Sequence, residues 1–136
     1  MIVLDTSALV AIIQAEPECD TFLNVIRTAE RVVVSAVSVL EAGMVLYARK
    51  GETGIDETTN LLDGMGVEIV PFDAALVQGA LQAFVRYGKG NNSLARLNFG
   101  DCAVYALAKG MNAPLLFKGN DFSETDISAA WRPVAP

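Results

Sequence analysis

The chain opens with the stretch Met1-Ile2-Val3-Leu4-Asp5-Thr6-Ser7-Ala8-Leu9. An apolar run without polar alternation is typical of a strand that is buried on both faces of a parallel sheet. The apolar spacing after Asp5 predicts a helix over residues 6–14. A buried strand that passes directly into a helix indicates an α/β fold, with Asp5 at the carboxyl end of the first strand.

The same alternation of strands and helices continues along the whole sequence. We predict further strands at 31–35, 67–70 and 115–117, an edge strand around 129–134, and helices at 17–29, 38–50, 56–64, 74–87 and 101–109. The stretch 88–98 is rich in Gly and Asn and is expected to be a loop. We therefore expect one domain over residues 1–136, a three-layer α/β/α sandwich around a mostly parallel sheet.

Acidic residues stand where these strands end. Asp5, Glu41 and Asp121 follow predicted strands, and Asp101 opens a predicted helix. Ligands of open α/β sheets bind at the carboxyl ends of the strands, so we expect these four side chains to gather there. Gathered carboxylates repel one another unless a cation joins them, and Mg²⁺ prefers oxygen ligands. The pattern predicts a metal-dependent enzyme that acts on phosphate esters.

Each acid also has a structural explanation when taken alone. Asp5 and Asp101 suit helix caps, Ser38-x-x-Glu41 matches a capping box, and Asp121 fits a turn. The convergence of all four on one edge of the sheet favours the functional interpretation.

The composition restricts the chemistry. The chain of 136 residues has no histidine, which removes the usual general base, the Ser-His-Asp triad and most zinc sites. Cys19 and Cys102 form no recognisable motif and are predicted to be small buried hydrophobes. The sequence has no apolar stretch of membrane-spanning length and no signal peptide, so we expect a cytoplasmic protein.

The charge distribution weighs both ways on nucleic-acid binding. A net charge of −6 argues against it, because phosphate contacts need Lys and Arg. However, the stretch between Asp73 and Asp101 has no acid and contains Arg86, Lys89 and Arg96. We expect these three residues to form a local basic strip that contacts phosphates beside the metal site.

Four motifs resemble those of a known family. They are Ile2 to Leu9, Ser35 to Glu41, Leu97 to Asp101, and Leu115 to Ile127. In this order they resemble PIN-domain ribonucleases, and more narrowly the toxins of VapBC toxin–antitoxin systems. The resemblance implies a PIN-like fold, endonucleolytic cleavage of RNA with Mg²⁺ or Mn²⁺, a homodimer, and inhibition by a small cognate antitoxin.

The resemblance also assigns roles to residues. It implies that Asp5, Glu41 and Asp101 are the metal-site acids. Many PIN domains carry their fourth acid, an Asp, where this chain has Gly119. Asp121 is therefore either the fourth acid with a different reach or a group that supports the metal ligands. Asp126 is a weaker candidate for the fourth acid.

We expect a mechanism of metal-assisted hydrolysis. Asp5 and Asp101 would hold the cation, Glu41 would bind it through water or orient the attacking water, and Asp121 would complete the negative ring or place a second ion. Three polar neighbours are candidates for support. The hydroxyls of Thr6 and Ser38 would bind phosphate or a metal-bound water, and Asn98 would orient Asp101.

Other interpretations remain open at this point. A PIN-like module without activity would keep the fold and only bind a partner. A haloacid-dehalogenase-type phosphatase needs a second Asp where Ser7 stands, and a receiver domain needs an Asp near Pro71. A separate expectation concerns assembly. We expect exposed apolar side chains on the helices, including Val37, Met44 and Tyr47, to bury against a second copy or an antitoxin helix.

Overall fold

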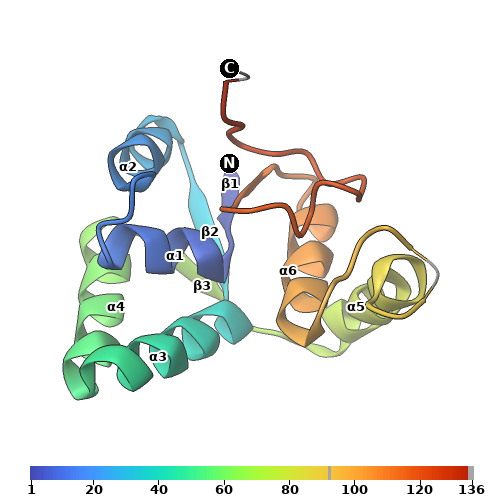
Figure 1. Ribbon diagram of the computed structural model, residues 1–136, viewed down its shortest axis with the longest axis horizontal. Coiled ribbons are helices and arrows are strands. Elements are labelled where there is room, and N and C mark those ends of the chain that lie inside the picture. The colour runs from blue at the N-terminus through green and yellow to red at the C-terminus, as the bar shows by residue number, and fades with distance from the viewer. Residues whose placement is uncertain (92, 135–136) are drawn as a thin grey trace.

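The computed structural model describes residues 1–91 and 93–134, which form alternating strands and helices (Figure 1). In chain order the elements are β1 (Ile2–Leu4), α1 (Thr6–Ile13), α2 (Cys19–Thr28), β2 (Val32–Ser35), α3 (Ala36–Lys50), α4 (Glu52–Gly64), β3 (Glu68–Val70), α5 (Ala74–Tyr87), α6 (Phe99–Gly110) and β4 (Leu115–Leu116).

The four strands form one parallel sheet in the order β3-β2-β1-β4. In its centre, Val3 of β1 pairs with Val33 of β2 on one side and with Leu115 of β4 on the other. Because every strand runs in the same direction, the carboxyl ends of the strands lie along one edge of the sheet. The segments that follow β1, β2 and β4 therefore start close together.

Side chains of the sheet alternate between two hydrophobic clusters. Val3 and Val33 pack with α5 and α6, whereas Leu4 and Val34 pack with α1, α2 and α4. All four are fully buried, and burial of such a side chain contributes about 1.5–3 kcal/mol. Figure 1 shows α1 to α4 on one side of the sheet and α5 and α6 on the other. The predicted α/β/α sandwich is confirmed.

Some boundaries differ from the prediction for local reasons. α3 begins at Ala36 because the Ser35 hydroxyl accepts a hydrogen bond from the Val37 N–H at 3.1 Å, so Ser35 is the cap and Ser38 lies within the first turn. α4 likewise begins earlier, at Glu52. Within the described residues, the stretch after Ala129 forms no strand, only an isolated bridge between Ala129 and Leu115, so the predicted edge strand is wrong.

Two smaller expectations concern membranes and thiols. Over residues 1–91 and 93–134, no helix combines the length and apolarity that a membrane crossing requires. Both cysteines are free thiols. Cys102 is buried as predicted, whereas Cys19 is half-buried.

Candidate active site

Asp5 caps α1 directly after β1 and is held by Ser7. The Ser7 N–H donates to Oδ2 of Asp5 at 3.1 Å, and the Ser7 hydroxyl donates to the same atom at 2.5 Å. Asp5 is buried, with only 6% of its surface exposed. Burial raises its pKa to about 6, although the bonds from Ser7 oppose the rise, and the nearby Glu41 carboxylate adds to it.

Ser7 is a site residue that the sequence reasoning missed. Its hydroxyl donates to Asp5 and also accepts a hydrogen bond at 2.9 Å from the Lys118 N–H, 111 positions later. The hydroxyl therefore ties the segment after β4 to the carboxylate after β1. The local sequence offered one signal, a hydroxyl two residues after the acid, but that pattern is equally typical of a helix cap.

Glu41 projects from α3 toward Thr6 and α6. The Thr6 hydroxyl donates to Oε1 of Glu41 at 2.5 Å, so Thr6 holds a site acid and does not present a free hydroxyl to RNA. A Cβ atom at position 100 would lie 2.6 Å from Oε2 of Glu41. Gly100 is thus the residue that lets α6 approach the Glu41 carboxylate.

Asp101 lies in the first turn of α6 and forms a capping box with Asn98. The Asn98 N–H donates to Oδ2 of Asp101 at 3.1 Å, and the Asp101 N–H donates to Oδ1 of Asn98 at 2.9 Å. The expected orientation of Asp101 by Asn98 is therefore present, through the backbone N–H. The pKa of Asp101 is raised to about 7, chiefly by burial and in smaller part by the charges of Asp5, Asp121 and Glu41, while the bond from the Asn98 N–H opposes the rise.

Asp121, in the segment that follows β4, is the candidate for the fourth acid. Its carboxylate is exposed and lies near enough to Asp101 to raise the pKa of that group. Gly119 has φ of +94°, a conformation that an Asp adopts only with strain. Asp126 lies elsewhere, because it accepts a hydrogen bond from the Tyr105 hydroxyl at 2.5 Å and pairs with Lys109 at 3.0 Å. It is therefore not a substitute for the fourth acid.

The donor set fits a hard divalent cation, although its side chains are not arranged around one. Over the described residues, no three carboxylates or thiols are placed to hold an ion together. Each carboxylate instead accepts a hydrogen bond from its own partner: Ser7 for Asp5, Thr6 for Glu41 and Asn98 for Asp101. Asp5 and Asp101, whose pKa values are raised chiefly by burial and in part by neighbouring carboxylates, nevertheless provide the oxygen ligands and the negative charge that such a cation requires.

The predicted RNA-binding residues differ in their surroundings. The Arg86 guanidinium stacks 4.8 Å from the Tyr87 ring centre and lies 3.9 Å from the Asp126 carboxylate. Lys89 and Arg96 are exposed in the segment that leads to α6. Ser38 is 0% exposed, so its hydroxyl has no surface on which to contact RNA. For that residue the structure contradicts the prediction.

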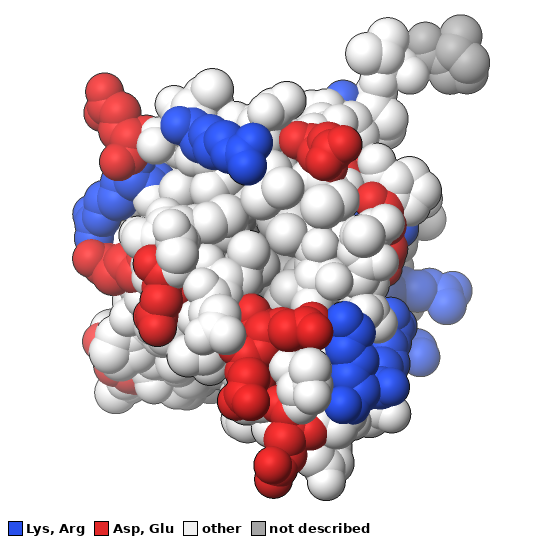
Figure 2. All heavy atoms as spheres, turned by 90° about the vertical axis from the view of Figure 1, so that its left-hand side faces the viewer, with Lys and Arg blue, Asp and Glu red and all other residues white. Residues whose placement is uncertain are grey.

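The face over α2 and α4 offers no alternative basic strip. Figure 2 shows acidic and basic side chains side by side in small groups on this face, with uncharged areas between the groups. Some of the bases are neutralised locally, since Arg31 pairs with Glu68 at 2.6 Å and Lys50 pairs with Glu57 at 2.8 Å.

Comparison with known proteins identifies the family. The PIN domain family model matches residues 2–128. Ribonuclease VapC30 of Mycobacterium tuberculosis is 41% identical over 131 residues, covering 96% of this chain and 99% of the relative. The chain belongs to the PIN-domain family, among the VapC ribonucleases. The resemblance read from the four motifs is therefore confirmed, and with it the expected class of endoribonuclease toxins.

Solved structures agree with this assignment at the level of the fold. Mycobacterium tuberculosis VapC20, a toxin that cleaves the sarcin–ricin loop, superposes with a TM-score of 0.81 at 19% identity, over 98% of this chain and 100% of that chain. VapBC2 from Rickettsia felis, bound to a promoter DNA fragment, gives a TM-score of 0.72 at 18% identity, over 95% and 96% of the two chains. Family membership overturns the phosphatase and receiver-domain alternatives.

Proposed function

We propose that this PIN-domain chain hydrolyses RNA phosphodiester bonds with a divalent cation, Mg²⁺ or Mn²⁺, held by Asp5, Glu41 and Asp101. The observation that carries the proposal is that acids from distant parts of the sequence come together, since the charges of Asp5, Asp121 and Glu41 add to the effect of burial in raising the pKa of Asp101. Carboxylates that are gathered in this way gain from a shared cation. The −6 net charge is consistent with a site that is incomplete without its ion.

Each residue has a role in the reaction. Asp5 and Asp101 would hold the cation directly, and Asp121 would add negative charge at the outer edge of the site. Glu41, oriented by the Thr6 hydroxyl, would bind the cation through water or orient the attacking water. When bound, the cation supplies a lowered pKa for that water and offsets charge on the phosphoryl oxygens.

The experiment is an RNA cleavage assay on the purified chain. Cleavage should be absent in EDTA, return with Mg²⁺ or Mn²⁺, and be lost in Glu41→Gln. Cleavage that persists in EDTA would contradict metal dependence. A protein that cuts no RNA with either ion, but still binds a partner, would instead support the inactive PIN-like module.

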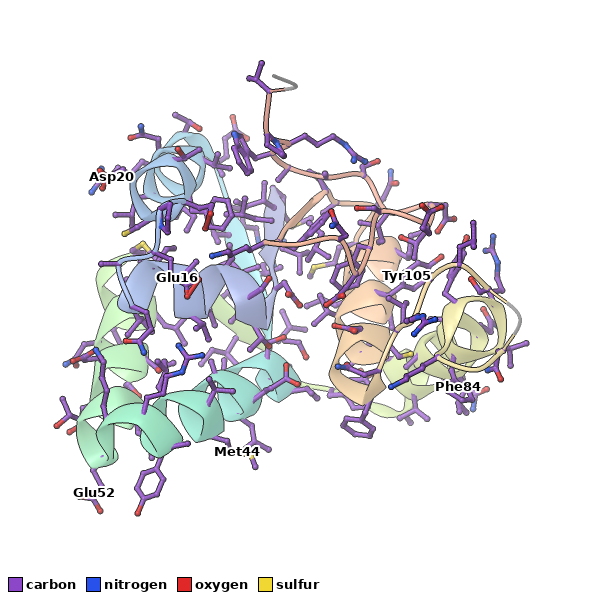
Figure 3. All side chains as sticks on the ribbon, in the orientation of Figure 1. Glu16, Asp20, Met44, Glu52, Phe84 and Tyr105 are labelled. Carbon is purple, nitrogen blue, oxygen red and sulfur yellow. The ribbon has the colours of Figure 1, made fainter. Side chains whose placement is uncertain are left out.

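We also propose that one apolar surface mediates assembly with a second copy. This α3 surface consists of Val39, Leu40, Gly43, Met44, Tyr47 and Ile55, which line a hollow of about 610 Å³. Leu40, Met44 and Tyr47 are 65%, 64% and 54% exposed. Met44 projects away from the fold in Figure 3. Val37, expected in this group, is half-buried and lies at the start of the same helix.

Light scattering tests the homodimer. The chain should be a dimer at micromolar concentration, and Met44→Glu should convert it to a monomer because a charge would be buried at the interface. Val134→Glu changes a side chain that is 93% exposed and outside the α3 surface, so it should remain a dimer. A monomeric parent protein would contradict the proposal.

The remaining partner is a small cognate antitoxin, and the place of action is the cytoplasm, where RNA substrates are present. A toxin–antitoxin complex from Klebsiella pneumoniae, which superposes with a TM-score of 0.73, supports the antitoxin.

A further inference from the structure

Asp121 differs from the other three acids in how it is held. Asp5, Glu41 and Asp101 each accept a hydrogen bond from a neighbouring residue. Asp121 is exposed and lies in a short turn after β4, residues 118–122, which we call the Asp121 turn. The place of its carboxylate, close enough to Asp101 to influence that group, therefore depends on how the backbone of this turn is anchored.

The far end of the Asp121 turn is fixed by packing. Phe122 is buried, and its ring centre lies 5.3 Å from that of Phe117. The Ser123 N–H closes the turn by donating to the Asn120 carbonyl at 3.1 Å. At this end the chain is held against the core.

The near end of the turn has one backbone anchor, followed by a residue that can act as a hinge. The Lys118 N–H donates to the Ser7 hydroxyl at 2.9 Å. The next residue, Gly119, has φ of +94°, and no atom lies within 4 Å of where its Cβ would be. Glycine has the widest choice of backbone conformations, so a single hydrogen bond before it does not fix the direction of the chain. A second anchor is needed to hold the turn in one place.

The Lys118 side chain supplies that second anchor. Its Nζ atom donates to Oε1 of Glu16 at 2.7 Å and lies 2.9 Å from Oε2 of Glu18. Both acids belong to the segment between α1 and α2, where Figure 3 labels Glu16. None of the three side chains is more than 37% exposed, so salt and water screen these ion pairs less than pairs at the open surface.

We propose that Lys118 is a positioning residue that keeps the Asp121 carboxylate beside Asp101. Its ion pairs with Glu16 and Glu18 hold the Asp121 turn against the segment before α2. Lys118 does not touch the cation and acts on it only through Asp121. The inference rests on the proposed function in taking Asp121 as part of the metal site.

Lys118→Met separates positioning from a simple effect of charge. The variant keeps most of the aliphatic stem and removes one positive charge near the acids. By charge alone, Mn²⁺ should then bind more tightly, because the site becomes more negative. Positioning predicts the opposite, a weakening of about tenfold, which is typical of groups that support metal ligands. Lys118→Arg keeps the charge and offers several N–H donors to the two carboxylates, so it should bind Mn²⁺ as the wild type does.

The first measurement is Mn²⁺ affinity by electron paramagnetic resonance on the full-length chain. Lys50→Met is the matched control, because Lys50 pairs with Glu57 at 2.8 Å and has a similar exposure. It should leave the affinity unchanged. In an Asp121→Asn background, Lys118→Met should change the affinity by less than about twofold, because the two residues act as one unit.

The second measurement needs no metal. Nitrogen-15 relaxation in EDTA reports the order parameter of the Asp121 amide, which should fall from about 0.85 in the wild type to below about 0.6 in Lys118→Met. Glu16→Gln combined with Glu18→Gln removes the ion pairs from the other side and should loosen the same amide. This double variant decides the question if Lys118→Met does not fold.

The outcomes separate the inference from the proposed function. Unchanged or tighter Mn²⁺ binding in Lys118→Met, a full loss that persists in the Asp121→Asn background, or an unchanged order parameter at Asp121 would overturn the inference. Metal-dependent cleavage by the wild type together with any of these results would leave the proposed function standing. A wild type that neither binds Mn²⁺ nor cleaves RNA would overturn the proposed function, and the order parameter in EDTA would still decide whether Lys118 holds the turn.

Discussion

Replacement of Asp5 by Asn should stabilise the metal-free protein at alkaline pH. The pKa of Asp5 rises from 3.8 to about 6 on folding, and each unit corresponds to about 1.36 kcal/mol. Between these two values the folded state binds more protons than the unfolded state, so stability falls as the pH rises through this window. The wild-type protein thus loses about 3 kcal/mol by pH 7 through this one carboxyl group.

Asp5→Asn removes that loss without removing the helix cap. Asn is as good a capping residue as Asp, and its Oδ1 atom accepts the same two hydrogen bonds that Ser7 donates. The free energy of unfolding of the variant in EDTA should therefore match that of the wild type near pH 4. At pH 8 it should exceed the wild-type value by up to about 3 kcal/mol.

Urea denaturation followed by circular dichroism, in EDTA at pH 4, 6 and 8, measures this difference. Asp73→Asn is the matched control, because Asp73 also caps a helix, accepting from the Leu76 N–H at 3.0 Å, but it is exposed. The control should show no pH-dependent gain. An Asp5→Asn variant that is no more stable than the wild type at pH 8 would refute the argument that burial and repulsion destabilise this carboxylate.

Two further predictions concern the approach of α6 and the binding of RNA. Gly100→Ala places a methyl carbon 2.6 Å from Oε2 of Glu41, so the Glu41 carboxylate must move. Cleavage should fall about a hundredfold, while the circular dichroism spectrum stays native. Cleavage at the wild-type rate would contradict the close approach of α6 to Glu41. Replacing both Lys89 and Arg96 with Ala should flatten the salt dependence of RNA binding by about one per residue. Arg86→Ala should change it less, because Asp126 already lies 3.9 Å from that guanidinium; an unchanged slope in the double variant would exclude an electrostatic role for the loop.

The fold and the three principal acids were predictable because their signals are local. A buried strand followed by Asp5 and a helix that starts near Asp101 are both visible in a few residues. Parallel strands then bring their carboxyl ends to one edge, whatever the details of the helices. The sequence alone therefore indicated the edge of the sheet at which these carboxylates gather.

The contacts within the site were not predictable because the partners are distant in sequence. Ser38-x-x-Glu41 reads as a capping box, but Glu41 is engaged by Thr6, 35 positions earlier, and the cap is Ser35. Arg86 lies in a stretch without acids, yet Asp126 meets it from near the other end of the chain. A pattern in one segment carries no information on which group another segment brings to it.

The most direct test of the central claim is to follow Mn²⁺ binding and RNA cleavage in parallel for the wild type and Asp101→Asn. The account predicts that the wild type binds Mn²⁺ and cleaves RNA only when the ion is present. It predicts that Asp101→Asn, with the capping bond to Asn98 kept, loses both the binding and the cleavage. Metal-dependent cleavage at the wild-type rate in Asp101→Asn would contradict the account.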